Sequence, residues 1–144
     1  MGALFTIMKR CEVFIDGSSR GNPGEAGCSF IVYSEGEKIF EGMEYLGIKT
    51  NNEAEYFGLL YGIKKAFELG CDELTIFTDS ELLQRQIKGL YKVRAPHLRI
   101  LFIEAHNLLK NFKVWEIKHV IRENNKLADS IAKLISKGGN HGKE

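Results

Sequence analysis

Four acidic side chains break the local pattern of the sequence. They are Asp16, Glu55, Asp79 and Asp129. Asp16 closes the apolar run Val13–Ile15 and has no helix to cap, and Asp79 closes a second apolar run in "TIFTDS". Ligands of open α/β sheets collect at the carboxyl ends of strands, so two apolar strands that end in Asp indicate a site. Taken alone, Asp79 is equally well explained by the helix that Ser80 would cap.

The other two acids belong to predicted helices. Glu53 has a structural explanation, because "TNNE" places it as the capping-box partner of Thr50. Glu55 has no such explanation, since it heads an apolar line at helical spacing formed by Leu59, Ile63 and Ala66. A carboxylate on that line is costly unless a cation or a metal meets it. Asp129 suits the dipole of the last helix and becomes a site candidate only beside the other three.

If these acids converge, they form a cluster of hard oxygen ligands without cysteine. Such a cluster selects Mg²⁺ or Mn²⁺ over Zn²⁺, and close carboxylates without a metal would raise one another's pKa. Two such ions, about 4 Å apart, can clamp an in-line phosphoryl displacement. The predicted chemistry is therefore metal-dependent phosphoryl transfer with Asp16, Glu55, Asp79 and Asp129 as ligands.

The elements that must position these acids follow from periodicity and turn signals. The pattern predicts strands over 11–16, 27–34, 38–47, 72–79 and 113–120, and helices over 50–69, 80–90, 96–111 and 124–137. Short turns join the first three strands into an antiparallel meander, whereas helical connections make the last two strands parallel. We expect an α/β fold of order βββαβααβα, with a five-stranded mixed sheet flanked by helices. Trp115, inside the last apolar strand, is expected in the core.

Length and composition predict one domain over residues 1–144, with an ordered core over about 9–136 and a flexible tail over 137–144. The net charge of +1 excludes a globally basic polyanion binder. Three scattered cysteines without a CxxC pair predict no disulfide framework and a reducing, cytoplasmic location. The N-terminal "MGALFTIM" is too short to span a membrane and lacks the features of a signal peptide. We expect a monomer that does not bind membranes.

Four short segments follow one another along the chain: "DGSSRGNPGEAG", "TNNEAE", "TDS" and "HVIRENNKLAD". Together and in this order, they make the chain resemble the type 1 ribonuclease H family. The resemblance runs from about Cys11 to Ile135 and implies the ribonuclease H-like fold. It also implies metal-dependent cleavage of the RNA strand of RNA–DNA hybrids, with 5′-phosphate and 3′-hydroxyl products. The catalytic acids it implies are Asp16, Glu55, Asp79 and Asp129, the same four that stand out on physical grounds.

The resemblance also implies the residues that contact the substrate. The turn after Asp16 would lie against the RNA backbone, and the start of the following helix would reach the minor groove and a DNA phosphate. Short polar groups and backbone amides suit that role, because the 2′-hydroxyl that marks RNA is displayed in the wide minor groove. Helix capping is the alternative explanation for the helix start, although capping does not require two consecutive Asn residues. The residues are Gly17, Ser18, Asn22, Thr50, Asn51 and Asn52.

Cationic residues near the proposed site complete the set of candidates. His119 has the spacing from Asp129 of a family histidine that assists proton transfer or product release, and Arg122 is the rival for that auxiliary role. The stretch 82–103 is locally basic and includes Arg85 and Lys88, but it has only a short connection where some family members carry a long basic insertion. The alternatives are a structural histidine at a strand end and an ordinary solvated helix face.

Two other functions remain open on the sequence alone. A module of the same fold could hold a duplex without cutting it, although clustered acids would not help it bind a polyanion. A nuclease acting also on double-stranded RNA would need the same acids. A nucleotide-binding loop is not indicated, because "GSSRGNPG" matches neither a Walker A nor a GxGxxG pattern.

Overall fold

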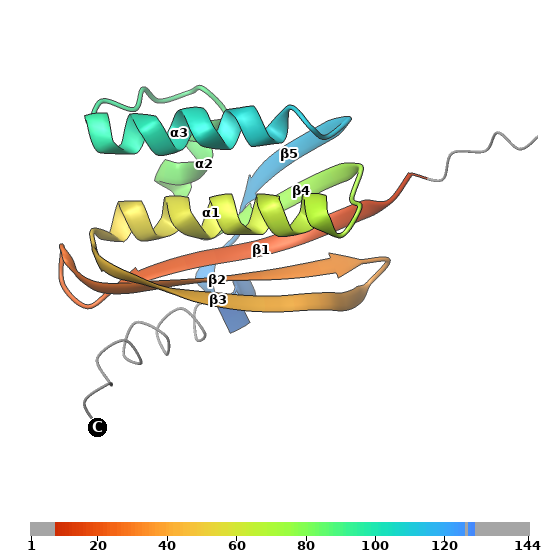
Figure 1. The fold of residues 1–144 in the computed structure, drawn as a ribbon, viewed down its shortest axis with the longest axis horizontal. Helices are drawn as coiled ribbons and strands as arrows, with labels where there is room; N and C mark the ends of the chain where they lie inside the picture. Colours follow the sequence, from red (N-terminus) through yellow and green to blue (C-terminus); the bar gives the residue numbers. More distant parts are fainter. Residues whose placement is uncertain (1–7, 126, 129–144) are drawn as a thin grey trace, which may run out of the picture.

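The computed structural model describes residues 8–125, 127 and 128, and within them a five-stranded mixed sheet carries helices (Figure 1). The sheet order is β3-β2-β1-β4-β5. The predicted α/β architecture and chain order are confirmed through the last strand. The elements are β1 Arg10–Ser19, β2 Gly24–Ser34, β3 Glu37–Lys49, α1 Asn51–Glu68, β4 Glu73–Thr78, α2 Glu81–Ile87, α3 Pro96–Leu109, β5 Val114–His119 and the 3₁₀ helix η1 Arg122–Asn125.

The sheet combines an antiparallel meander with two parallel strands, as the connection lengths predicted. β1 pairs antiparallel with β2 on one side and parallel with β4 on the other. The hairpin between β2 and β3 turns at Glu35 and Gly36, which both have positive φ. α1 connects β3 at one edge of the sheet to β4 on the far side of β1, and such a helical crossover lets β4 run parallel to β1. β1 is thus the central strand.

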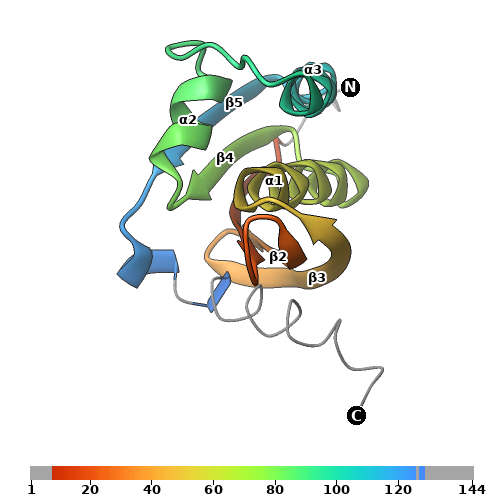
Figure 2. The ribbon, with the colours of Figure 1, turned by 90° about the vertical axis from the view of Figure 1, so that its left-hand side faces the viewer.

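Side-chain alternation divides the sheet into two faces. Val13 and Ile15 are fully buried under α1, which lies along the sheet with α3 beyond it on the same side (Figures 1 and 2). The intervening residue Phe14 points to the other face and packs with Ile31 and Ala128. The face under α1 carries the larger core, which also holds the partly buried Trp115, as expected.

β1 is longer than the sequence pattern predicted. The prediction ended the strand at Asp16, but its pairing with β2 continues through Ser19 opposite Ala26. The residues "GSS" read as turn formers, yet their backbone groups are paired with a neighbouring strand that is itself rich in small residues. Asp16 therefore lies within the part of β1 that pairs with β2. The pairing of β1 with β4 stops at Ile15 opposite Thr78, so Asp16 lies just past the end of that pairing.

A disulfide joins Cys11 to Cys71, which corrects the prediction that the cysteines are unpaired. Sequence spacing hid the pair, because the two residues are 60 positions apart. The backbone nitrogens of Asp72 and Glu73 donate to the carbonyl of Lys9, and this contact brings Cys71 beside the start of β1. The cysteine count consequently no longer supports the predicted reducing, cytoplasmic location.

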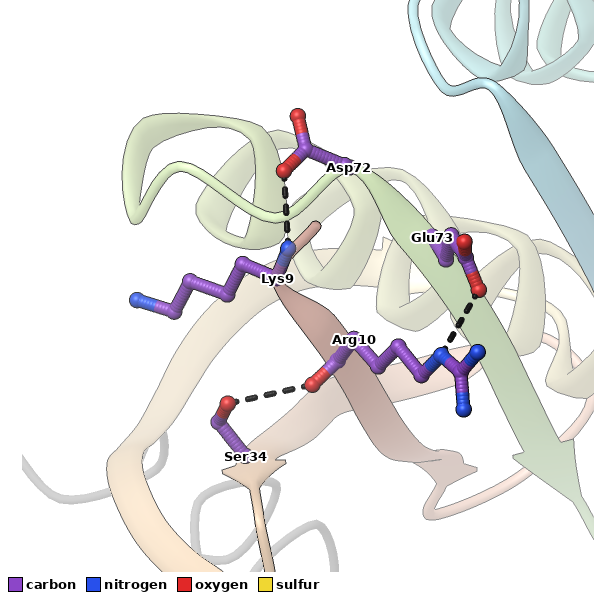
Figure 3. Close-up of polar contacts among 5 residues, drawn as sticks. All are labelled: Lys9, Arg10, Ser34, Asp72 and Glu73. Atoms are coloured by element: carbon purple, nitrogen blue, oxygen red, sulfur yellow. Dashed lines mark hydrogen bonds and ion pairs between the residues drawn. The ribbon is translucent and has the colours of Figure 1, made fainter. Parts of the chain in front are cut away.

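Polar contacts surround this end of β1 (Figure 3). The Lys9 backbone nitrogen donates to Asp72 Oδ2 at 2.8 Å, and Arg10 Nε lies 3.1 Å from Glu73 Oε1. Ser34 Oγ donates to the Arg10 carbonyl at 3.0 Å, so β2 is tied to the same point. The start of β1 is thus fixed to β2 and to the start of β4, at the end of the strand opposite Asp16.

Three predictions concern residues outside the described part of the chain. They are the body of the last helix with Asp129, the tail over 137–144, and the first seven residues of "MGALFTIM". No helix within residues 8–125, 127 and 128 has the length and apolarity needed to cross a membrane.

Candidate active site

Asp16 is a buried carboxylate on the central strand. It is only 1% exposed, and the start of α1 lies directly against β1 at this point. A Cβ atom placed on Gly17 would lie 2.2 Å from the carbonyl carbon of Ala54. Only glycine permits this close approach, which places the next residue of α1, Glu55, beside Asp16.

Glu55 lies in the second turn of α1, and a capping box fixes the residue at which this helix begins. Thr50 caps the helix, and its side chain and that of Glu53 exchange hydrogen bonds with each other's backbone nitrogens, as the sequence predicted. Leu59, Ile63 and Ala66 are buried on the face below. The cap and the buried face together fix the rotation of the helix, so that Glu55 faces the sheet.

Asp79 follows directly on β4, at the same edge of the sheet. Ser80 caps α2, with its Oγ accepting from the Leu83 nitrogen at 3.1 Å. The capping role suggested for this stretch thus falls to Ser80, while the Asp79 side chain is 2% exposed and lies 3.6 Å from Arg122 Nε through Oδ2. Neither carboxylate oxygen of Asp79 accepts a hydrogen bond from the described residues.

One carboxylate oxygen from each of Asp16, Glu55 and Asp79 lies within 4.8 Å of the other two. Burial first, and then the charge of Asp79, raises the pKa of Glu55 to about 8. A hydrogen bond from the Gly17 backbone, the charge of Arg122 and a hydrogen bond with Asp16 act in the opposite direction. Such crowding is unfavourable for three ionised acids and favourable for a divalent cation with oxygen ligands.

The donor set therefore fits Mg²⁺ or Mn²⁺. Its oxygens are hard and come from rigid elements. Glu55 Oε1 is shielded from solvent and accepts no hydrogen bond from the described residues, so it has capacity left for a ligand. Cys28 is the one free cysteine among the described residues and is buried opposite Gly17, where it offers no carboxylate-like donor.

Asp129, the fourth predicted acid, lies outside the described residues, but the chain leading to it is placed. Ala128 is buried, and its carbonyl accepts a hydrogen bond from Ser29 Oγ. Ser29 is the β2 residue directly opposite Asp16. The last described residue before Asp129 thus contacts the sheet beside the acid cluster.

The two auxiliary candidates lie on the same side of the site. His119 is the last residue of β5, opposite Thr78, and is exposed. It interacts electrostatically with Glu81 at the start of α2. Arg122 begins η1 and forms the ion pair with Asp79. Of the two, Arg122 is the one with a contact to a clustered acid.

The predicted substrate residues form a hydrogen-bonded junction between the β1–β2 turn and the start of α1. The Ser19 backbone nitrogen donates to Asn51 Oδ1 at 3.0 Å, and the Asn51 nitrogen donates to Asn22 Oδ1 at 3.1 Å. Asn22 and Asn51 thus have structural roles that sequence reasoning did not assign. Asn22, Asn51 and Asn52 are exposed, while Gly17, Ser18 and Thr50 are half-buried.

The basic candidates lie on α2 and after it. Arg85 forms an ion pair with Glu81 at 2.7 Å and lies over the Tyr91 ring, 5.4 Å from its centroid. Lys88 is exposed at the end of the helix. The structure brings neither residue into the acid cluster.

Asn125 was missed by sequence reasoning. In "RENNKLAD" it reads as one of several polar loop residues, but its side chain is 2% exposed and its Nδ2 donates to the Ile15 carbonyl at 2.9 Å. No sequence signal distinguishes it from Asn124, which is exposed.

Comparison with known proteins assigns this arrangement to a family. A family model described as reverse transcriptase-like matches residues 14–135. A ribonuclease HI of Halobacterium salinarum is 37% identical over 124 residues, which are 85% of this chain and 62% of that protein. A ribonuclease H of Helicobacter acinonychis is 33% identical over 137 residues, 88% of this chain and 93% of that protein. The chain also matches only 33% of the length of a bifunctional protein of Mycobacterium tuberculosis.

Solved structures agree with the sequence relatives. The crystal structure of RNase H1 from Halobacterium salinarum superposes with a TM-score of 0.87 at 35% identity, covering 90% of this chain and 98% of that one. LC11-RNase H1, solved in complex with an RNA/DNA hybrid, gives a TM-score of 0.83 at 32% identity, covering 89% and 98%. These matches, over most of the chain and almost all of several relatives, establish that the chain belongs to the type 1 ribonuclease H family.

Proposed function

We propose that the chain is an endoribonuclease that hydrolyses the RNA strand of RNA–DNA hybrids with the help of Mg²⁺ or Mn²⁺, leaving 5′-phosphate and 3′-hydroxyl ends. The observation that carries the proposal is the convergence of Asp16, Glu55 and Asp79, whose carboxylate oxygens lie within 4.8 Å of one another. A relative of the same fold, LC11-RNase H1, was crystallised with an RNA/DNA hybrid.

Asp16, Glu55 and Asp79 would hold the metal, with Asp129 as the fourth ligand. When bound, two divalent ions supply an activated water and stabilise the charge on the leaving oxygen. The protein's part is to hold the carboxylates in place for the metal. The capping box at Thr50 and the close contact at Gly17 hold Glu55, and the end of β4 holds Asp79.

The polar junction beside the cluster is the proposed contact for the duplex. Asn22 and Asn51 lock the β1–β2 turn to the helix start, and the proposed contact surface consists of this junction with the neighbouring residues Gly17, Ser18, Thr50 and Asn52. Such a surface suits a minor groove displaying 2′-hydroxyls. Arg122, paired with Asp79, supplies positive charge where a cleaved phosphate would lie, and His119, opposite Thr78, is the candidate for proton transfer or product release.

The proposal is tested by incubating the protein with labelled RNA–DNA hybrid, double-stranded RNA and double-stranded DNA, each with Mg²⁺, Mn²⁺ or EDTA. We expect metal-dependent cleavage of the hybrid's RNA strand and none in EDTA. Asp16→Asn should abolish turnover while the circular-dichroism spectrum stays native. Cleavage of double-stranded RNA at a similar rate would widen the substrate class. Binding of the hybrid without cleavage under any metal would instead favour the non-cleaving duplex-binding module.

A further inference from the structure

Asn125 is a deeply buried polar residue to which the proposed function gives no role. Its side chain is 2% exposed, and its Nδ2 donates to the Ile15 carbonyl at 2.9 Å across 110 positions of sequence. Its Oδ1 accepts no hydrogen bond from the described residues. Buried amides are normally hydrogen-bonded, and the Nδ2 hydrogen bond of this side chain goes to the backbone carbonyl of the residue next to Asp16.

The Ile15 carbonyl, which accepts this hydrogen bond, lies at the end of the β1–β4 pairing. β4 pairs with β1 as far as Thr78, which lies opposite Ile15, and then leaves the sheet to bring Asp79 into the acid cluster. The pairing of β1 with β4 thus ends immediately before Asp16. The Asn125 amide donates to β1 at this end, on the residue that directly precedes Asp16 and lies opposite the residue that directly precedes Asp79.

Asn125 is also the middle of three attachments of one segment. Arg122, three residues earlier, lies 3.6 Å from Asp79 Oδ2. Ala128, three residues later, accepts a hydrogen bond from Ser29, which is opposite Asp16. Asp129 is bonded to Ala128. Arg122, Asn125 and Ala128 therefore each contact a residue of the acid cluster or a residue beside it, and Asn125 is the one of the three that contacts the central strand.

We propose that Asn125 is a positioning residue of the metal site, an inference that rests on the proposed function. It holds the described residues on either side of it in place, so that Arg122 stays on Asp79 and Ala128, which directly precedes the proposed fourth ligand Asp129, stays on Ser29 beside Asp16. Asn125 itself acts through the Ile15 carbonyl and contacts neither metal nor substrate in this role. Loss of such outer partners typically costs about 10–100-fold in metal affinity.

The test measures Mg²⁺ binding without substrate. Asn125→Leu has a similar shape but no donor, and Asn125→Ala serves if leucine does not fold. Thermal unfolding is followed from EDTA through a series of Mg²⁺ concentrations, and cleavage of the hybrid is measured over the same series. Tyr56→Phe is the matched control, because it removes another buried hydrogen bond, from Tyr56 to Gln86 Oε1 at 2.8 Å, that does not touch the segment.

We expect the Asn125 variants to need about 10-fold more Mg²⁺ for half-maximal stabilisation and half-maximal cleavage than the wild type. Tyr56→Phe should lose stability in EDTA yet keep the wild-type Mg²⁺ dependence. Asn125 variants that lose stability in EDTA but retain that dependence would overturn the inference, because Asn125 would then be structural only. A wild type that shows neither Mg²⁺-dependent stabilisation nor cleavage would instead overturn the proposed function, and this inference with it.

Discussion

Two glutamates on the first turns of α1, Glu53 and Glu55, separate a structural carboxylate from a reactive one. Glu53 Oε1 accepts from the Thr50 nitrogen at 2.8 Å, and Thr50 Oγ1 accepts from the Glu53 nitrogen at 3.1 Å. Glu55 instead lies with Asp16 and Asp79 and has a raised pKa. Residue type and helix are the same, so the pair provides an internal control for the metal site.

Glu55→Gln is expected to lower kcat for the hybrid by about 10²-fold or more, because an amide cannot supply the charge that a metal ligand needs. Glu53→Gln should change kcat less than about two-fold, since its amide oxygen can still accept from the Thr50 nitrogen. Steady-state kinetics on both variants, with their unfolding temperatures, make the comparison. A larger loss in Glu53→Gln would contradict the assignment of chemistry to Glu55.

The metal-free protein should lose stability as the pH rises from about 5 to 8.5. Burial and Asp79 raise the pKa of Glu55 in the folded state to about 8, above its ordinary value of about 4.3. The folded state then binds the proton more tightly than the unfolded state. The resulting stabilisation is complete below the unfolded pKa and is lost as the pH rises through the folded pKa.

In EDTA we expect the unfolding temperature to fall across this pH range by at least about 3 °C. Saturating Mg²⁺ should flatten the profile, because a bound cation replaces the proton. Glu55→Gln should flatten it in EDTA as well. The measurement is a set of thermal unfolding curves, and an equally steep fall in Glu55→Gln would show that another group carries the effect.

At the scale of secondary-structure elements, two glycines of α1 add close contacts with β1 to the one at Gly17. A Cβ atom on Gly58 would lie 2.9 Å from the backbone oxygen of Asp16. One on Gly62, a turn later on the same helix, would lie 2.9 Å from Val13 Cγ1, a side-chain atom. Side chains yield more easily than backbone in a packed core. Gly58 therefore sets the separation between α1 and Asp16 itself.

Gly58→Ala is expected to lower kcat by about 10-fold or more, because a small displacement of Asp16 misaligns the carboxylates. Gly62→Ala has the same gain in helix propensity and should keep kcat within about two-fold. Kinetics at saturating Mg²⁺ and unfolding temperatures distinguish the two. Equal losses of kcat in both variants would mean that the helix moves as a whole and that Gly58 has no special effect on Asp16.

Features that depend on local sequence patterns could be predicted, whereas contacts between residues far apart in the sequence could not. The capping box at Thr50, the Ser80 cap and the order of the strands and helices along the chain could be predicted, because each depends on local patterns. The disulfide and the burial of Asn125 could not, since each joins residues 60 or more positions apart. The extension of β1 past Asp16 was hidden by "GSS", whose turn-forming tendency is overridden by pairing with β2. Asp16, Glu55 and Asp79 were predicted because a buried carboxylate is anomalous wherever it falls.

At the scale of the whole molecule, the disulfide and the acid cluster occupy opposite ends of β1. Cys11 is near the start of the strand and pairs with Cys71, whereas Asp16 lies just past the last residue that pairs with β4. Closing a loop of this size stabilises a protein chiefly by restricting its unfolded state, by about 4 kcal/mol for 60 residues. Stability and activity should therefore respond differently to reduction.

Cys11→Ser/Cys71→Ser, or treatment of the wild type with a reductant, should lower the unfolding temperature by about 10 °C and leave kcat at 25 °C nearly unchanged. Reductant should have no further effect on the double variant, which serves as the control. Thiol titration of the denatured, unreduced wild type should find one free thiol, that of Cys28. Three free thiols would show that the pair is not oxidised in the protein as isolated.

The weak net charge of +1 means that any attraction to a duplex must come from local groups. Lys88 and Lys92 are both exposed. Lys88 caps the end of α2, the helix that follows Asp79, and Lys92 lies in the connection between α2 and α3. Lys110 and Lys113 are also exposed, but the backbone nitrogen of Lys113 donates to the Asp72 carbonyl, so this second pair of lysines lies toward the disulfide end of the sheet.

If Lys88 and Lys92 contact phosphates, the double variant Lys88→Ala/Lys92→Ala should raise KM for the hybrid and leave kcat unchanged. It should also reduce the slope of log KM against log salt concentration by about 1–2. Lys110→Ala/Lys113→Ala removes the same charge and should leave that slope as in the wild type. Equal changes in both variants would assign the effect to net charge alone, and no change in either would leave the polar junction of Asn22 and Asn51 as the proposed contact with the duplex.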